Sequence, residues 1–214
     1  TVSRFLPNAV TYRLLKQLGR DDQKLKQSLD ANLGAGLQRL YALQHLDGGW
    51  GWWADDKSQV YISAYVVQGL VEANRAGYGV DQDRLDRGIA FLKTALENQT
   101  AAKAQGQSSA SALNARSYVL FVLAEAGQPD RGRTVALYDQ RATLDLYARS
   151  YLLMTLKTLG GGDERVAVLV GELMGSAILH ATDAHWEERT QDYWNMSSDT
   201  RTTALALQAL VRAD

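Results

Sequence analysis

A short helical motif recurs along the chain, and this repetition restricts the possible fold more than any other feature. A small or hydroxyl residue precedes a tyrosine and an apolar run at Thr11-Tyr12, Ala64-Tyr65, Ser117-Tyr118 and Ser150-Tyr151, and Thr202-Thr203-Ala204 fits the same register with Thr203 in the tyrosine position. Each copy is followed by a more amphipathic helical pattern. Units of this kind bury their inner faces only by stacking side by side.

The repetition predicts an all-α chain in which apolar and amphipathic helices alternate. Only two prolines, Pro7 and Pro129, interrupt the sequence, and apolar residues recur at helical spacing nearly everywhere. We expect an α/α toroid of paired inner and outer helices, with an open α-solenoid as the second choice. The repeated tyrosines are expected to be core residues by default.

Helix boundaries follow from capping residues, glycines and the spacing of apolar residues. We expect helices over residues 8–18, 21–44, 58–76, 81–96, 112–126, 129–140, 142–159, 163–180 and 199–214. Residues 118–124 are apolar on every face, so this part should be surrounded by other helices. We expect one domain over residues 1–214, with loops near residues 46–57, 98–111 and 181–198.

The loop after the second expected helix holds three of the five tryptophans. Its central residues are Asp47, Gly48, Gly49, Trp50, Gly51, Trp52 and Trp53. Glycine permits the positive φ angles of a tight turn, and each tryptophan brings a large apolar face with one N–H donor. We favour an architectural role, in which the loop connects two helices and its tryptophans cover the core, over a ligand site. A second aromatic loop contains Trp186, Glu187 and Trp194.

Few side chains suggest catalysis or metal binding. The three histidines, His45, His180 and His185, lack the spacings of helical zinc sites, so we expect no metal site. Asp55 and Asp56 could form a carboxylate pair, but with Ser58 they stand where a helix cap is expected. We therefore expect no catalytic residues, no cofactor-binding residues and no cofactor.

Composition excludes several classes of function. The chain has no cysteine, which removes disulfides and thiolate chemistry from what these residues can do alone. The net charge is −1, and basic residues are spread along the chain, so we expect no nucleic-acid partner. No apolar run reaches the roughly 18 residues of a membrane span. Since the chain starts at Thr1 without methionine, we expect it to be part of a longer protein.

The central loop and the two ends of the chain resemble one family. Residues 44–53, followed by Ser63-Ala64-Tyr65, fit several α/α toroids, including terpene cyclases. Residues 1–8 resemble the segment that directly follows the Cys-x-Glu-Gln thioester motif of bacterial alpha-2-macroglobulins, relatives of the complement thioester proteins. Trp186-Glu187-Glu188 and residues 194–210 also look like the thioester domain of that family. The resemblance covers essentially the whole chain.

This resemblance implies a periplasmic or cell-surface protease trap that is not an enzyme. In that family an internal thioester between cysteine and glutamine captures the attacking protease. The motif would lie just before Thr1, and a match to the histidine that assists acyl transfer in some complement proteins is missing. The implied partners are the other domains of the parent protein and target proteases, and further toroid helices would follow the chain. The alternatives are a terpene-cyclase-like or polysaccharide-lyase-like toroid enzyme, using Asp55, Asp56 or His185, and a structural helical repeat.

Overall fold

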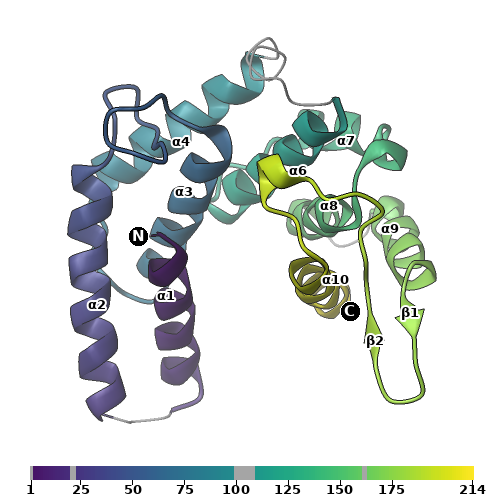
Figure 1. Cartoon of the computed structure of the whole chain (residues 1–214), viewed down its shortest axis with the longest axis horizontal. Helices are drawn as coiled ribbons and strands as arrows, with labels where there is room; N and C mark the ends of the chain where they lie inside the picture. Colours follow the sequence, from purple (N-terminus) through teal and green to yellow (C-terminus); the bar gives the residue numbers. More distant parts are fainter. Residues whose placement is uncertain (1, 20–22, 99–108, 161–162) are drawn as a thin grey trace. The chain divides into compact units, whose positions relative to one another are not determined.

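The computed structural model describes residues 2–19, 23–98, 109–160 and 163–214, which belong to two compact units (Figure 1). The first unit extends from Thr1 to Glu97 and the second from Asn98 to Asp214. The described residues are almost entirely helical apart from one short hairpin, which confirms the all-α prediction. The predicted loop over residues 98–111 lies mostly outside the described residues, and residues 109–111 belong to a helix.

The described residues of the first unit form four helices. They are α1 (Val2–Gln17), α2 (Gln23–Ala42), α3 (Val60–Arg75) and α4 (Gln82–Glu97). Helix α3 packs against both α1 and α4, and α1 also packs against α2. Successive turns of α2 bury Leu29, Leu33, Leu37 and Leu40 at a spacing of three or four residues, as expected for one helical face. Asp81 caps α4, because its carboxylate accepts a hydrogen bond from the Arg84 backbone N–H at 3.2 Å.

Helix α1 begins earlier than predicted, at Val2 instead of Asn8, so Pro7 lies inside the helix. The reason is the tertiary environment of Phe5, whose side chain is only 2% exposed. Its ring fills the space left by the missing side chains of Gly36 on α2 and Gly69 on α3. Burial of this aromatic side chain stabilises the first turns of α1 by an amount comparable to what Pro7 costs.

Gly36→Ala should destabilise the chain by about 1–3 kcal/mol, the usual range for overpacking a core. A Cβ atom at Gly36 would lie 2.6 Å from Cδ2 of Phe5, and the ring has little room to retreat because its other edge lies against Gly69 of α3, where an added Cβ atom would be 3.1 Å from Cδ1. Gly34→Ala in the same helix is the control. Nothing lies within 4 Å of its Cβ position, so it should stabilise α2 by up to about 1 kcal/mol. Urea unfolding followed by circular dichroism would measure both, and equal effects would contradict the packing argument.

The second unit is organised around helix α8 (Leu146–Leu159), which packs against α6, α7, α9 and α10. These helices are α6 (Ser109–Glu125), α7 (Arg131–Tyr138), α9 (Glu164–Gly175) and α10 (Asp199–Ala213). Two 3₁₀ turns, η1 (Arg141–Thr143) and η2 (Tyr193–Asn195), complete the unit with the hairpin strands β1 (Ile178–Leu179) and β2 (Ala184–His185). Residues 118–124 of α6 are all buried, as predicted, and the rings of Tyr118 and Tyr151 lie 4.8 Å apart.

The helix predicted over residues 163–180 ends at Gly175, and this part of the prediction is wrong. Leu169 and Leu173 are fully buried, but Ile178 is 37% and Leu179 is 76% exposed, so a continued helix would have no apolar face to bury. The chain instead forms the antiparallel β1–β2 hairpin, in which Ile178 pairs with His185. The helices α9 and α10 begin where they were predicted, and their N-caps are Asp163 and Ser198, whose side chains accept backbone N–H bonds.

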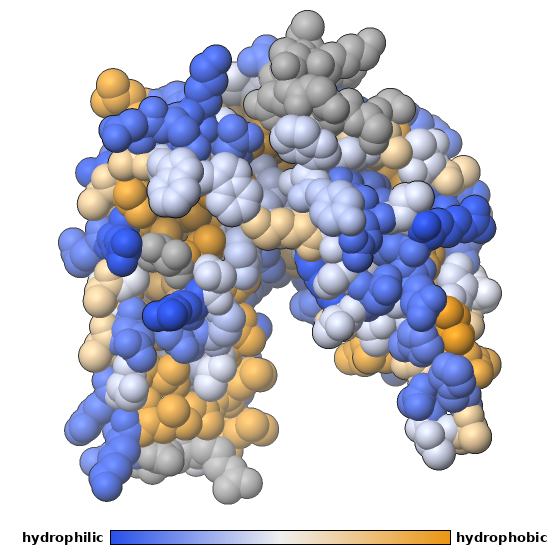
Figure 2. Space-filling model, in the orientation of Figure 1, coloured by the Kyte–Doolittle hydropathy of each residue, from blue (hydrophilic) through white to orange (hydrophobic). Residues whose placement is uncertain are grey.

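Several apolar side chains remain at the surface of each unit. Figure 2 shows hydrophobic residues along the lower parts of α1 and α2, where Leu14, Leu18 and Leu25 are at least 40% exposed. In the second unit, Met174 and Leu179 are exposed at 58% and 76%. Apolar side chains scattered in this way are common on protein surfaces and do not by themselves identify a binding site.

Candidate functional site

The loop between α2 and α3 is held by hydrogen bonds to its own backbone and to α4. The His45 N–H donates to the Gly49 carbonyl at 2.9 Å, and Gly48 has a φ of +88° that favours glycine. A Cβ atom at Gly48 would also lie 2.5 Å from the Arg87 carbonyl oxygen. The Arg87 guanidinium donates to the His45 carbonyl at 3.0 Å. The sharp turn and the close approach of α4 therefore both require glycine at position 48.

Of the three tryptophans in this loop, only Trp50 is part of the core. Its side chain is 1% exposed, and its indole N–H donates to the Leu40 carbonyl near the end of α2 at 2.7 Å. Its backbone N–H donates to the Ser63 hydroxyl in α3 at 2.8 Å. Trp52 is 58% and Trp53 is 78% exposed, so the expectation that all three tryptophans cover the core is wrong for these two. Trp50 thus connects α2 to α3.

The acidic residues of this loop do not cap α3, contrary to the sequence-based expectation. The Asp56 carboxylate accepts the backbone N–H of Trp52 at 3.0 Å, and Asp55 is exposed. Ser58 donates to the Asp47 carboxylate at 2.8 Å, and the N-cap residue of α3 is Gln59, which makes no side-chain cap bond. These polar groups are used to close the loop on itself, because its turns leave backbone donors that need acceptors nearby.

The second aromatic loop repeats the arrangement around Trp50 in the second unit. Trp186 is 3% exposed, and its indole N–H donates to the Leu173 carbonyl near the end of α9 at 2.7 Å. Its backbone N–H donates to the Thr203 hydroxyl of α10, and this hydroxyl donates to the Trp186 carbonyl. Thr203 therefore corresponds to Ser63 and not to the tyrosine position, so the register assigned to the last repeat is wrong by two residues.

The other residues predicted for the second loop lie at the surface. Trp194 is 53% exposed, and the side chain of Glu187 is 56% exposed. Glu187 accepts a hydrogen bond from His185 Nε2 at 3.1 Å in this arrangement of the imidazole. The neighbouring Glu188 points inward and caps α8, since its carboxylate accepts the backbone N–H groups of Leu146 at 3.0 Å and Tyr147 at 2.8 Å.

A buried polar cluster centred on Asp192 was not identified from the sequence. Asp192 is 8% exposed, and its carboxylate accepts hydrogen bonds from four side chains of the second unit. The donors are Ser111 at 2.7 Å, Asn195 at 2.7 Å, Tyr147 at 2.9 Å and Asn114 at 3.0 Å. Arg201 lies beside the cluster and donates to the Asn195 carbonyl at 2.7 Å. The cluster ties η2 to α6 and α8, and the sequence offered no distinct signal, because Asn114 lies among other polar residues in the first half of α6.

Burial and hydrogen bonding act oppositely on the acids of this cluster. Burial alone would raise the pKa of Asp192, but the hydrogen bonds donated by Asn195 and Asn114 help to lower it below the usual value. Asp145 lies next to Asn114, and its burial together with the charge of Glu188 raises its pKa to about 6. Burial, followed by the charge of Asp192, raises the pKa of the Tyr147 hydroxyl. Asp192 therefore stays ionised as an acceptor near neutral pH.

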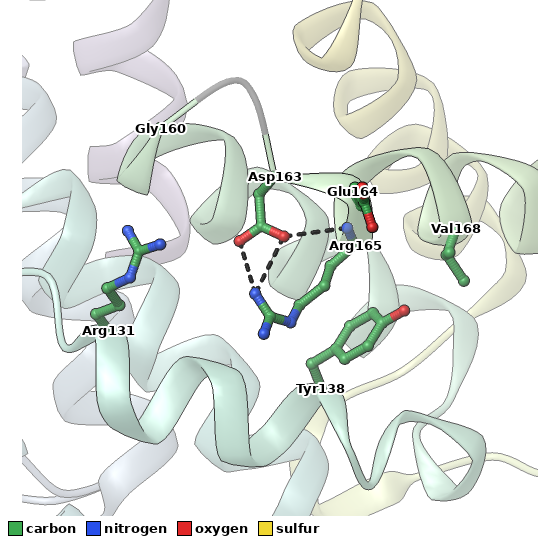
Figure 3. Close-up of a pocket in the computed structure, with 7 residues that line it drawn as sticks. All are labelled: Arg131, Tyr138, Gly160, Asp163, Glu164, Arg165 and Val168. Atoms are coloured by element: carbon green, nitrogen blue, oxygen red, sulfur yellow. Dashed lines mark hydrogen bonds and ion pairs between the residues drawn. The ribbon is translucent and has the colours of Figure 1, made fainter.

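A surface pocket of about 670 Å³ lies between α7 and the start of α9 (Figure 3). Arg131, Tyr138 and Glu164 line it together with Asp163 and Arg165. The Asp163 carboxylate pairs with the Arg165 guanidinium at 3.0 Å, and the Arg165 guanidinium lies 5.7 Å from the centre of the Tyr138 ring. Two acids balance two arginines, so the pocket has no excess charge with which to select an ion.

Comparison with known proteins assigns the chain to a family. A family model described as the A-macroglobulin TED domain matches residues 1–212. The chain belongs to this family. The resemblance of the central loop and of both ends to alpha-2-macroglobulins is confirmed.

Two curated relatives are bacterial alpha-2-macroglobulins. The Thermotoga maritima protein is 37% identical over 93 residues, which cover 44% of this chain and 6% of that protein. The Escherichia coli protein is 28% identical over 168 residues, which cover 75% of this chain and 10% of that protein. The chain therefore spans a tenth or less of the length of these relatives.

Solved structures of alpha-2-macroglobulins share the fold. Escherichia coli alpha-2-macroglobulin activated by porcine elastase matches 99% of this chain and 18% of its own, with a TM-score of 0.72 and 23% identity. Salmonella alpha-2-macroglobulin reacted with methylamine matches 98% of this chain and 13% of its own, with a TM-score of 0.75 and 21% identity. The α/α toroid-type fold is thereby confirmed. None of the helices in the described residues is long and apolar enough to span a bilayer.

Proposed function

We propose that this chain is the thioester-type domain of a bacterial alpha-2-macroglobulin-like protease trap. In this proposal a Cys-x-Glu-Gln segment directly precedes Thr1 in the longer protein and forms the internal thioester. The observation that carries the proposal is the match of residues 1–212 to the TED domain model. Its bacterial relatives are named alpha-2-macroglobulins, and two of the matching structures are described as activated by elastase or trypsin.

The packing of α1 suggests how this chain would present such a segment. Phe5 is buried against Gly36 and Gly69 within the first turns of α1, which holds the start of the helix firmly on the first unit. A reactive segment attached to Val2 would then have a defined position, as covalent chemistry with a large partner requires. The chain contains no cysteine, so the thiol has to come from the preceding segment.

The proposed reaction is a single acyl transfer without turnover. A lysine amine of the protease attacks the acyl carbon, an amide bond forms, the carbon–sulfur bond breaks, and the cysteine leaves as a thiol after the amine proton moves to sulfur. The proposed partners are the target protease and the other domains of the longer protein. The proposed location is the periplasm or the cell surface, where such proteases would be met.

Several of the acids that an α/α toroid enzyme could use are occupied in structural roles. Asp56 accepts the Trp52 N–H, and Asp47 accepts hydrogen bonds from Gly49 and Ser58. Asp192 and Glu188 are satisfied by internal donors in the second unit. Since general acids and bases must reach a substrate, these contacts favour the trap over the enzyme.

Methylamine treatment of the full-length protein tests this function. Methylamine should be incorporated into the wild-type protein with release of one thiol per thioester, measured by mass spectrometry and a thiol assay. A full-length variant with alanine in place of the motif cysteine should do neither. It should also fail to form the sodium dodecyl sulfate-resistant adduct with trypsin that the wild type forms. A wild-type protein that stays unmodified and forms no adduct would refute covalent capture.

A further inference from the structure

The β1–β2 hairpin brings two histidines and one aspartate to the same face. Ile178 pairs directly with His185, and Leu179 pairs with Ala184. Because side chains alternate between the faces of a strand, His180 lies on the same face as Ile178 and therefore on the same face as His185. The His180 backbone N–H donates to the Asp183 carbonyl at 2.9 Å, which places Asp183 opposite His180 on that face.

The side chains follow this backbone arrangement closely. The two imidazole rings lie parallel, with an interplanar angle of 5° and centres 5.4 Å apart. One potential ligand atom from each of His180, Asp183 and His185 lies within 4.8 Å of the other two. His180 and Asp183 are exposed and His185 is half-buried, so small rotations of the side chains could bring these atoms to the roughly 2.0–2.2 Å ligand distances of a zinc ion.

A fourth residue orients one of the candidate ligands. His185 Nε2 lies 3.1 Å from the carboxylate of Glu187, which follows His185 by two residues along the chain. A histidine that binds a metal through one ring nitrogen usually donates its other N–H to a carboxylate, which fixes the tautomer. This contact leaves Nδ1 of His185 available as the ligand atom.

We propose that His180, Asp183 and His185 bind one divalent transition-metal ion, with Glu187 positioning His185. Two imidazoles and a carboxylate are ligands that zinc and similar ions prefer, whereas calcium prefers a larger set of oxygen ligands. Bound metal would join the two strands near the turn. The inference does not depend on the proposed protease trap, because all four residues are in the second unit and none takes part in acyl transfer.

The sequence pattern did not reveal this site because only the spacings of helical zinc sites were considered, and residues 181–198 were expected to form a loop. Histidines at positions 180 and 185 are five residues apart, which does not place them on one face of a helix. A hairpin with its turn at residues 181–182 brings the same two residues together diagonally across the strands. The expectation of no metal site followed from the absence of the histidine spacings that helical zinc sites use.

Titration of the 214-residue chain with zinc chloride in a calorimeter tests the proposal. The wild type should bind one zinc ion per chain, and His180→Ala or His185→Ala should each weaken binding by at least about tenfold. Asp183→Asn should also weaken zinc binding, although the hydrogen bond from the His180 backbone N–H to the carbonyl of residue 183 is kept. Glu187→Gln should weaken zinc binding by roughly tenfold, because His185 loses the carboxylate that positions its ring. Circular dichroism would establish that each variant is folded.

His45→Gln is the matched control, because His45 is the third histidine and lies outside the hairpin. It should bind zinc as the wild type does, and calcium chloride should give no comparable signal with any variant. In two-dimensional NMR spectra the imidazole signals of His180 and His185 should shift with zinc while those of His45 stay in place. Equal shifts at all three histidines, unchanged affinity in the His180→Ala variant, or no saturation by about 1 mM zinc would overturn the proposal.

Discussion

Replacing Trp50 by alanine should lower the free energy of unfolding by about 3–5 kcal/mol, the range found when large buried aromatic side chains are truncated. The indole is 1% exposed and packs so closely on α4 that a Cβ atom at Gly88 would lie 2.9 Å from its ring. The substitution also removes the donor to the Leu40 carbonyl, which then stays buried without this partner. Helices α2 and α4 both lose their contact with the indole, while the backbone bond from residue 50 to Ser63 of α3 is kept.

Trp53→Ala is the control for this prediction. Trp53 belongs to the same loop but is 78% exposed, so its removal should change stability by no more than about 0.5 kcal/mol. Urea unfolding followed by far-ultraviolet circular dichroism would compare both variants with the wild type. A Trp50→Ala loss below about 1 kcal/mol would show that the loop is peripheral to the core.

Asp192→Ala should have an effect of similar size, about 3–5 kcal/mol, because it removes one partner from a buried charged network. Four donors, from Ser111, Asn114, Tyr147 and Asn195, would lose their shared acceptor in the second unit. Each unsatisfied buried donor costs about 1–3 kcal/mol before relaxation and water entry reduce the sum. Asp192→Asn keeps one acceptor oxygen but loses the charge, so its loss should be smaller.

The pH dependence of stability gives a second measurement on Asp192. The folded-state pKa of Asp192 is lower than its unfolded value, so ionised Asp192 contributes stability above the unfolded pKa. That contribution is lost as the pH falls through the folded-state pKa. The difference in stability between the wild type and Asp192→Asn should therefore shrink on acidification.

Asp139→Ala, at an exposed aspartate of the same unit, is the control for both measurements on Asp192. Its stability should stay within about 0.5 kcal/mol of the wild type at neutral pH. A larger loss would show that the effect is not specific to the cluster.

The helical character of the chain and the family were both predictable from the sequence. Apolar residues at helical spacing give each helix one face that must be buried, and this pattern depends only on neighbouring residues. The buried stretch at residues 118–124 and the helix starts near Asp81 and Asp163 were predicted for the same reason. The resemblance of the loop around Trp50 and of both chain ends to alpha-2-macroglobulins agreed with the family model.

The start of α1 and the end of α9 could not be predicted, since each depends on what packs against it. Phe5 extends α1 past Pro7 because two glycines on other helices make room for its ring. Residues 176–180 leave the helix because no apolar surface is available to Ile178 and Leu179. Local sequence preferences contain no information about such distant neighbours, which is why helix ends are harder to predict than helices.

The sequence alone determined that this chain forms paired helices and that its two aromatic loops each follow an amphipathic segment. Only the tertiary structure decided which side chains in those loops are buried. Trp50 and Trp186 are buried because each finds a carbonyl at the end of one helix and a hydroxyl on the next, at Ser63 and Thr203. Trp52 and Trp53 share the same chemistry but face no such partners and stay exposed. Burial of a polar aromatic side chain requires both an apolar space and a hydrogen-bond acceptor, and long-range packing provides both.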